Sequence, residues 1–237
     1  MDFLVFIYFC IFVSLNFSPY YYFIEELFLR KKVNYMTKER QKKVKSILIS
    51  QPEPENKTPY HALAEKHKLK LHYRSFIQVD ELTTMEFREQ RISILNHDAV
   101  IFTSKNSMNH YFGMMEKLRL KIPDHTKYFC VSEAIAYYLQ NFIVYRKRKV
   151  FTGERTFVSL LPLMQKHKDS KFLLPCSDLL KGQTNKTMEE SGLDYTKAVM
   201  YKVVAANLSD LSDVKFDVLA FFSPTGITSL YENFPDF

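Results

Sequence analysis

The sequence predicts an α/β fold with parallel sheets arranged as two related lobes. Five apolar or aromatic runs each stop at a serine, and helical patterns follow most of them, which is the order expected of βαβ units. The serines that end these runs are Ser50, Ser104, Ser132, Ser177 and Ser223. Two runs also match each other, because Asp98-Ala-Val-Ile-Phe-Thr-Ser104 and Asp217-Val-Leu-Ala-Phe-Phe-Ser223 place Asp, Phe and Ser at the same offsets. We therefore expect two doubly wound parallel-sheet lobes of common design.

Length and composition suit two small lobes better than one. At 237 residues the chain is long for a single compact α/β unit. It has only five glycines and neither a G-x-G-x-x-G nor a Walker pattern, so no dinucleotide or P-loop nucleotide site is expected. The net charge is +7, but residues 1–45 hold eight Lys or Arg against four Asp or Glu, so the body carries only +3. We therefore expect no nucleic-acid partner, although a local basic patch would suit a polyanionic small molecule.

Residues 1–42 form an N-terminal extension that is first apolar and then basic. Residues 3–24 are almost wholly apolar and long enough to span a bilayer as a helix. Arg30, Lys31 and Lys32 follow, a flank typical of an anchor whose downstream part faces the cytoplasm. The alternative is that translation starts at Met36, which would make residues 1–35 an artefact of start-site choice. We expect a cytoplasmic protein, with inner-membrane anchoring only if residues 3–24 are a genuine anchor.

Turn and cap residues define the first elements of the body. The apolar run at residues 45–50 predicts a strand, and a loop rich in proline follows it. Thr58-Pro59 then opens a helix that ends near Lys68, because threonine suits the N-cap and proline the first helical position.

The later elements follow from two kinds of pattern. Runs rich in β-branched and aromatic residues predict strands, whereas apolar residues three or four apart predict helices. Gly192 ends one helix, because glycine readily adopts the left-handed conformation of a helix stop. In chain order we expect an extended run at 71–79, helix 85–96, strand 98–104, helix 108–120, strand 127–132, helix 133–141, a basic strand at 143–151, an amphipathic helix near 156–164, strand 171–177, helix 185–191, strand 195–205, strand 217–223 and helix 225–233.

The lobe that contains the second repeat is short of strands. Residues 45–50, 71–79 and 217–223 supply only three, which leaves an unpaired edge. The first repeat strand is followed by three or four more. We therefore expect this lobe to be incomplete, with a C-terminal segment missing.

The serines that precede helices are the best candidates for binding a ligand. A strand that stops at serine and gives way to a helix presents a hydroxyl, backbone N–H groups and the positive helix end together, which suits carboxylates or phosphates. Ser104 with Lys105 and Asn106 forms one such group, and Ser223 with Thr225 and Gly226 forms another. The alternative is that each serine only caps its own helix, which by itself would stabilise the helix by about 1 kcal/mol.

Other chemistry has little support in the sequence. The seven histidines are scattered without metal-ligand spacing, and the three cysteines form no cluster, so no metal site is expected. Asp98 and Asp217 precede their strands, at the ends opposite to the serines, and are expected to cap turns rather than to act in catalysis. Ser177 lies in Pro-Cys-Ser-Asp, which is not a nucleophile elbow.

Five short motifs resemble, in order, those of uroporphyrinogen-III synthases. They are Ile101-Phe-Thr-Ser104, Val131-Ser-Glu-Ala134, Leu174-Pro-Cys-Ser177, Val199-Met-Tyr201-Lys-Val-Val and Phe221-Phe-Ser-Pro-Thr-Gly226. The resemblance covers residues 43–237. It implies two α/β lobes joined by a two-stranded ladder, one inserted in the other, with lobe 1 at residues 43–79 plus 206–237 and lobe 2 at residues 80–205.

The resemblance also implies a reaction and roles for residues. The family closes the linear tetrapyrrole hydroxymethylbilane to uroporphyrinogen III, inverting the last pyrrole ring and losing water, without cofactor or metal. Its substrate carries eight carboxylates and would lie between the lobes. Tyr201 matches a tyrosine thought to assist loss of the substrate hydroxyl, or else it is only a residue of the ladder. We expect Ser104, Lys105, Asn106, Ser132, Ser177, Ser223, Thr225 and Gly226 to bind substrate, in a lyase that is a monomer.

Two departures from the family pattern leave other functions open. The family commonly has glycine at the positions of Ser132 and Ser177, which points to turn-shaping roles there, and its usual arginine after Ser177 is replaced at best by Lys181 or Lys186. One alternative function is a non-catalytic, two-lobed binding protein for an anionic small molecule. Another is a membrane-anchored regulatory fragment that has kept the fold and lost the activity.

Overall fold

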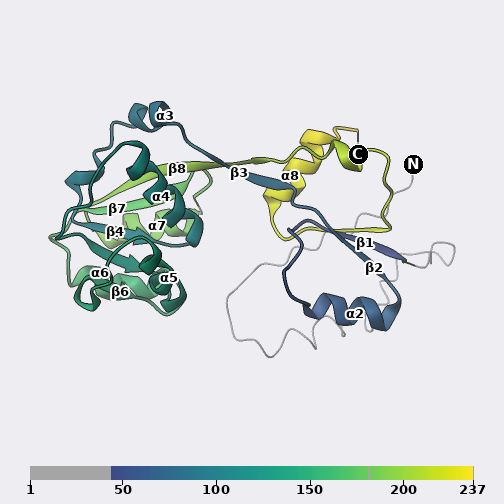
Figure 1. Cartoon of the computed structure of the whole chain (residues 1–237), viewed down its shortest axis with the longest axis horizontal. Helices are drawn as coiled ribbons and strands as arrows, with labels where there is room; N and C mark the ends of the chain where they lie inside the picture. Colours follow the sequence, from purple (N-terminus) through teal and green to yellow (C-terminus); the bar gives the residue numbers. More distant parts are fainter. Residues whose placement is uncertain (1–43, 181, 237) are drawn as a thin grey trace. The chain divides into compact units, whose positions relative to one another are not determined.

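A computed structural model describes residues 44–180 and 182–236 of the chain (Figure 1). The predicted N-terminal extension and Lys181 lie outside the described residues. The described part of the chain divides into two compact units, a larger one at Val79–Val204 and a smaller one that combines residues 44–78 with residues 205–236. Each unit has helices together with parallel strands, so the α/β prediction is confirmed.

A six-stranded sheet forms the centre of the larger unit, in the order β3-β8-β7-β4-β5-β6. Its strand β4 has side chains that are at most 2% exposed, which explains why the sequence there is apolar throughout instead of alternating. The strands that run parallel are β4 (Ala99–Phe102), β5 (Lys127–Cys130), β6 (Val150–Thr152), β7 (Phe172–Ser177) and β8 (Tyr195–Ala205). Their carboxyl ends therefore share one edge of the sheet.

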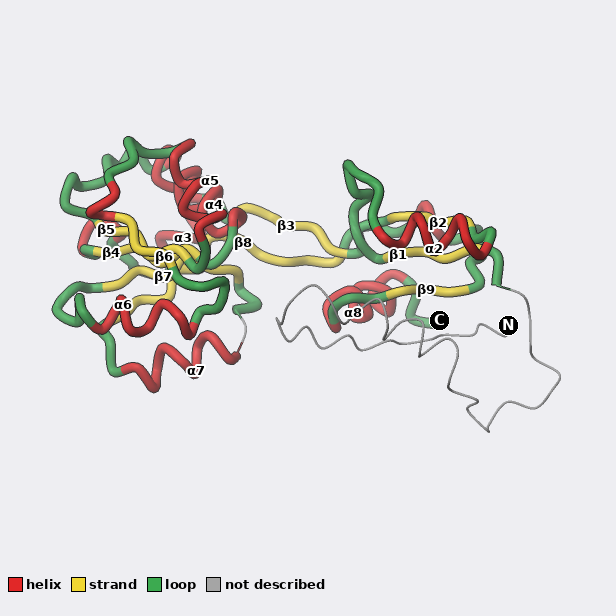
Figure 2. The backbone as a smooth tube through the Cα atoms, turned by 90° about the horizontal axis from the view of Figure 1, so that it is seen from below, coloured by secondary structure: helices red, strands yellow, loops and turns green. Residues whose placement is uncertain are grey.

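Helices cover both faces of this sheet, as Figure 2 shows. Val100 and Phe102 of β4 pack with α4 and α5, whereas Ala99 and Ile101 pack with α6 and α7. This division follows from the alternation of side chains along a strand. The helices of the unit are α3 (Thr84–Glu89), α4 (Lys105–Lys117), α5 (Glu133–Tyr138), α6 (Leu161–Gln165) and α7 (Gly182–Ser191).

The strand β3 (Ile77–Glu81) pairs with β8 in the opposite direction to the others. The backbone N–H of Ala206 donates to the carbonyl of Phe76 at 2.9 Å, and that of Leu82 donates to the carbonyl of Met200 at 3.2 Å. Residue numbers rise along one strand as they fall along the other, which defines an antiparallel pair. The chain passes between the two units through these two strands.

A three-stranded parallel sheet in the order β2-β1-β9 forms the smaller unit. Its small core contains the edge-to-face pair of Phe76 and Phe221, with ring centroids 5.3 Å apart, together with Leu48 and Leu230. The elements are β1 (Ser46–Ile49), α2 (Pro59–His67), β2 (Lys70–Tyr73), β9 (Val218–Ala220) and α8 (Pro224–Asn233).

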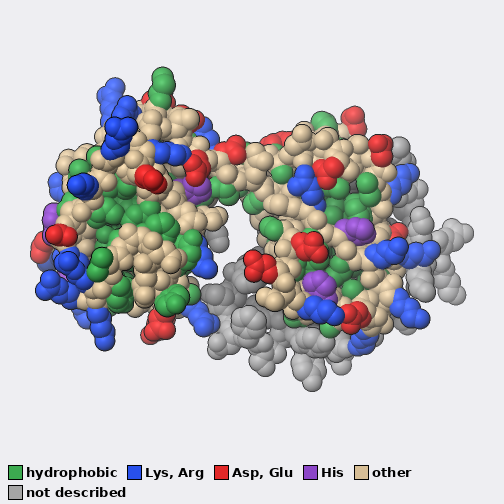
Figure 3. Space-filling model, viewed as in Figure 1, with side chains coloured by type: hydrophobic (Ala, Val, Ile, Leu, Met, Phe, Trp, Pro, Cys, Tyr) green, Lys and Arg blue, Asp and Glu red, His purple; other side chains and the backbone are tan. Residues whose placement is uncertain are grey.

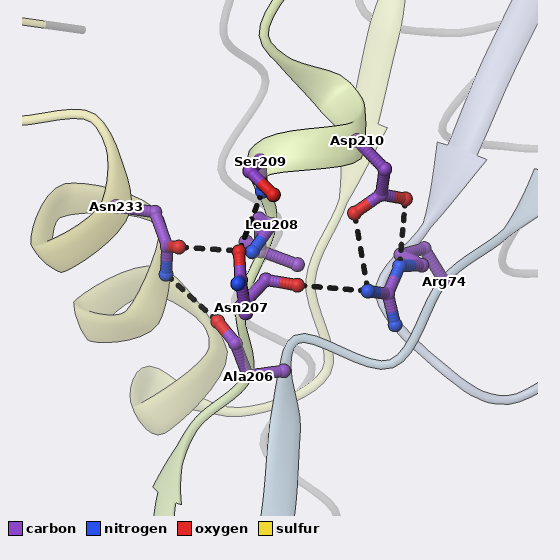
Figure 4. A network of polar contacts seen from close by, with 7 residues as sticks. All are labelled: Arg74, Ala206, Asn207, Leu208, Ser209, Asp210 and Asn233. Carbon is purple, nitrogen blue, oxygen red and sulfur yellow. Dashed lines mark hydrogen bonds and ion pairs between the residues drawn. The ribbon is translucent and has the colours of Figure 1, made fainter.

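Side-chain hydrogen bonds fix the loop that follows β8 in the smaller unit (Figure 4). The Asn233 amide donates to the carbonyl of Ala206 and accepts from the backbone N–H of Leu208, both at 2.9 Å. Arg74 holds Asp210 through two N–H groups, at 2.9 and 3.1 Å. The helix α8 and the residues after β2 therefore both brace this loop.

The two repeat strands have matching contacts in the two units. The Asp98 carboxylate accepts the backbone N–H of Lys171 at 3.0 Å, just ahead of β7. The Asp217 carboxylate accepts the backbone N–H groups of Lys45 and Ser46 at 2.8 and 2.9 Å, where β1 begins. Each aspartate thus binds the start of a neighbouring strand that is distant in the sequence, instead of capping a local turn as the sequence predicts.

Among the predicted elements that are wrong in extent, three have a clear physical reason. The run at residues 71–79 breaks between β2 and β3, because Phe76 turns into the core of the smaller unit while the two strands join different sheets. The helix at 85–96 stops at Glu89, and Arg91 then adopts the left-handed conformation. The basic strand at 143–151 is strand only from Val150, because four successive cations offer no apolar face to a sheet.

Surface charge is mixed in the described part of the chain. Figure 3 shows basic and acidic side chains interspersed on the visible face of each unit. Within residues 44–180 and 182–236, no helix is long and apolar enough to cross a membrane.

Candidate functional site

Three of the predicted serines lie at the carboxyl edge of the larger sheet. Ser104 caps α4, since its hydroxyl accepts the N–H of Ser107 at 3.0 Å. Ser132 caps α5 more weakly, accepting the N–H of Ile135 at 3.4 Å. Ser177 is the last residue of β7. The capping role that the sequence leaves open is thus present at Ser104 and Ser132, and it does not by itself exclude ligand binding at this edge.

Tyr201 joins two of these serines. The Ser104 and Ser177 hydroxyls lie close enough to its phenol group to influence its pKa, Ser177 pairs with Tyr201 in the sheet, and Tyr201 is only 8% exposed. Burial is the main reason why the pKa of Tyr201 is raised above its usual value, and the two serine hydroxyls partly oppose that rise. Tyr201 therefore stays protonated at neutral pH, as a phenol near the hydroxyls of the strand ends.

A β-bulge sets the position of Tyr201. Cys176 pairs with Val199, but the next residue, Ser177, pairs with Tyr201, so Met200 is the extra residue in β8. The Gln90 side chain holds Val199 from the other side, donating to its carbonyl at 2.8 Å and accepting its N–H at 3.0 Å. Without the bulge, Met200 would stand opposite Ser177. No pattern in the sequence predicts this bulge.

His110 is a residue of this site that the sequence analysis missed. Its ring stacks on the Tyr201 ring with centroids 4.6 Å apart and planes 28° apart. Its Nδ1 is buried without a hydrogen-bond partner among the described residues, and Glu81 Oε1 is 3.6 Å away, too far for a normal hydrogen bond. Burial lowers the pKa of His110, and Lys117 adds to this while Glu81 opposes it. No metal-ligand or catalytic spacing marks His110, so no sequence pattern could have selected it.

Lys105 and Asn106 begin α4 on the same edge. The Lys105 ammonium lies over the Tyr138 ring, 4.9 Å from its centroid. The Tyr138 hydroxyl in turn donates to Asn109 at 2.9 Å, which connects α5 to α4. Asn106 is exposed. A cation and an amide therefore stand beside the capping serine, in the first turn of the helix.

The smaller unit has a second group of predicted residues at its own carboxyl edge. Ser223 caps α8 by accepting the N–H of Gly226 at 3.3 Å, and Thr225 lies in the same turn. A Cβ atom placed on Gly226 would lie 3.7 Å from the Ser50 hydroxyl and 3.8 Å from that of Ser223. Ser50, Ser223 and Gly226 therefore converge, while Phe221 lies behind them, 3.3 Å from the same Cβ position.

Several expectations concern residues away from these two groups. Lys186 forms an ion pair with Glu190 at 3.7 Å within α7. Cys130 and Cys176 are buried free thiols, and burial raises their pKa values to about 12 and about 11. In the described ranges, no group of three His, Cys, Asp or Glu side chains is placed to hold a metal ion.

Two surface hollows lie elsewhere in the units. One of about 460 Å³ lies on the larger unit beside Phe112, Phe142 and the loop that enters β5, at the amino edge of the sheet. The other, of about 390 Å³, lies on the smaller unit beside α2 and Tyr73. Neither of these two hollows includes the serines or Tyr201, so the candidate site rests on its hydroxyl and aromatic chemistry.

Comparison with known proteins identifies one family. A family model described as Uroporphyrinogen-III synthase HemD matches residues 59–237, which is well over half of the chain. A mutant uroporphyrinogen III synthase from Thermus thermophilus resembles the fold with a TM-score of 0.52 and 17% identity, over 80% of this chain and 77% of that one. The uroporphyrinogen-III synthetase of Helicobacter pylori does so with a TM-score of 0.51 and 18% identity, over 80% and 78%. No curated protein matches the chain. At such identities the structural likeness is evidence of the fold alone.

Proposed function

The chain belongs to the uroporphyrinogen-III synthase family, and we propose that it closes hydroxymethylbilane to uroporphyrinogen III using the two groups of residues at its strand ends. The family acts on a tetrapyrrole substrate, in a lyase-type reaction. The observation that carries the residue assignment is the meeting of Tyr201 with Ser104 and Ser177 at the carboxyl edge of the larger sheet. This edge is where open α/β sheets bind their ligands.

The groups at the strand ends suit a substrate rich in carboxylates. Serine hydroxyls, exposed N–H groups of a first helical turn and the positive helix end all stabilise an anion. We assign Ser104, Lys105, Asn106, Ser132 and Ser177 to substrate binding in the larger unit. Ser223, Thr225 and Gly226 in the smaller unit are also assigned to carboxylate binding, since they offer the same chemistry at the start of α8.

Tyr201 is assigned as the proton donor for the step that removes water. The hydroxymethyl carbon of the bilane must lose its oxygen, and a proton delivered to that oxygen makes it a better leaving group. A phenol whose pKa is raised by burial is protonated throughout the neutral range and so can donate. The remaining work is to hold a reactive chain in the folded shape that leads to ring inversion, which is a matter of positioning.

The test is an assay of the full 237-residue chain with enzymatically generated hydroxymethylbilane. We expect uroporphyrinogen III in excess over the isomer I that forms spontaneously, and a loss of most of that excess in Tyr201→Phe. The matched control is Tyr231→Phe, because Tyr231 is an exposed tyrosine in α8. If the chain leaves only isomer I, the proposed activity is wrong. Saturable binding of the bilane without turnover would instead support the non-catalytic binding protein.

A further inference from the structure

The proposed function uses the hydroxyl of Tyr201 and leaves the contact on the flat face of its ring unexplained. The hydroxyls of Ser104 and Ser177 lie near its phenol group. The flat face of the ring lies against His110, with centroids 4.6 Å apart. That separation is at the close end of the range for stacked aromatic rings. The hydroxyl and the ring face therefore lie beside different residues.

His110 is itself held in place by its surroundings. Its side chain is 12% exposed, and the charged side chains that influence it, among the described residues, are Glu81 on β3 and Lys117 on α4. The Lys117 ammonium binds the Glu81 carboxylate. The positive charge of Lys117 therefore offsets most of the effect that the Glu81 charge has on the imidazole. With Nδ1 buried, the ring is neutral and has no charge to contribute to the phenol.

We propose that His110 is a positioning residue for Tyr201: a neutral ring that confines the phenol so that its hydroxyl stays beside Ser104 and Ser177. This inference rests on the role proposed for Tyr201, whereas the contact between the two rings is observed independently of that role. A neutral stacked ring limits rotation and tilt of its neighbour without changing the charge of the site. Small misplacements of a reacting group have large kinetic costs, so such confinement affects the rate more than binding.

Fluorine NMR tests the contact without any need for turnover. The full chain is labelled with 3-fluorotyrosine, and the resonance that disappears in Tyr201→Phe identifies the ring among the 15 tyrosines. His110→Ala is expected to move this resonance toward the shift of a free tyrosine and to broaden it. His110→Phe, which keeps the stacked ring, is expected to leave it close to the wild-type position. His125→Ala is the matched control, because His125 is exposed and lies beside Asp98 at the other end of β4.

Kinetics with hydroxymethylbilane provide the second arm of the test. We expect His110→Ala to lower kcat by about tenfold or more with KM changed by less than about threefold, and His110→Phe to restore most of kcat. Far-UV circular dichroism confirms folding, and His110→Leu, which keeps bulk without an aromatic face, replaces alanine if that variant does not fold.

The two arms separate the failure of this inference from the failure of the proposed function. If the wild-type chain makes no uroporphyrinogen III, the proposed function falls and the fluorine spectra alone decide the role of His110. A Tyr201 resonance that is unchanged in His110→Ala would overturn the inference whatever the activity. So would a folded His110→Phe variant that behaves like His110→Ala in both arms.

Discussion

Replacing Ser104 by aspartate separates helix capping from substrate binding. The Ser104 hydroxyl accepts the N–H of Ser107 at 3.0 Å, and an aspartate oxygen can accept the same hydrogen bond. Aspartate and serine are similar N-caps, so Ser104→Asp is expected to change the free energy of unfolding by less than about 0.5 kcal/mol, whereas Ser104→Ala should lose about 1 kcal/mol. The free energy of unfolding should therefore be lower for Ser104→Ala than for Ser104→Asp.

For kcat/KM the order should be reversed, with the lower value in Ser104→Asp and the higher value in Ser104→Ala. The new carboxylate would stand at the edge assigned to the carboxylates of the substrate, beside the Tyr201 hydroxyl. Two like charges about 4 Å apart repel by about 1 kcal/mol in water and by about 4 kcal/mol near a protein surface. Since about 1.4 kcal/mol corresponds to a factor of ten, kcat/KM should fall by about fivefold to a thousandfold. Ser104→Ala adds no charge and should lose much less.

The assay compares initial rates of uroporphyrinogen III formation and thermal unfolding by circular dichroism in the same preparations. Gln140→Glu is the control for net charge, because it adds one negative charge beyond the end of α5, away from the strand ends. We expect this control to keep the wild-type kcat/KM. A stable Ser104→Asp variant with undiminished kcat/KM would show that Ser104 only caps its helix.

Three further outcomes follow from burial and charge. Gly226→Ala should change the free energy of unfolding by less than about 1 kcal/mol, because alanine favours the helix while its Cβ crowds the Phe221 ring. The variant should nevertheless raise KM, because the new methyl group fills the space between the Ser50 and Ser223 hydroxyls. An unchanged KM would remove Gly226 from the site. The hydrogen bond from Lys202 is the main reason why the pKa of Glu86 is lowered to about 2, so the stability it contributes should be present above its ordinary value of 4.5 and lost as the pH falls toward 2. The gap in thermal stability between wild type and Glu86→Gln should therefore close over that range, and a gap that widens in acid would contradict the sign. Cys130 and Cys176 should resist iodoacetamide at about pH 8 in the native chain and react in urea, as peptide mass spectrometry would show, because burial keeps both thiols protonated; native labelling of either thiol would contradict its burial.

The local features of the chain were open to prediction because they depend on neighbours in the sequence. Thr58 with Pro59 begins α2, and Gly192 follows the end of α7 with a φ of +67°. The spacing of Asp, aromatic residue and Ser in the two repeats placed an aspartate and a capping serine at opposite ends of two strands, and both strands have that arrangement in the structure. The separate break at Phe76 was not predictable, since it depends on a core made by residues far away in the chain.

The sequence by itself therefore determined which residues could meet a ligand, because each of the serines ends or follows a strand and the parallel strands of one sheet end at the same edge. Only the tertiary structure decided how the central residue of that edge is held. Tyr201 stands opposite Ser177 because of a one-residue bulge in β8, and it stacks on His110, which lies 91 positions earlier in the chain. A bulge is a matter of register between two strands, and a ring stack is a matter of packing between a helix and a strand, so neither leaves a periodic signal in the sequence.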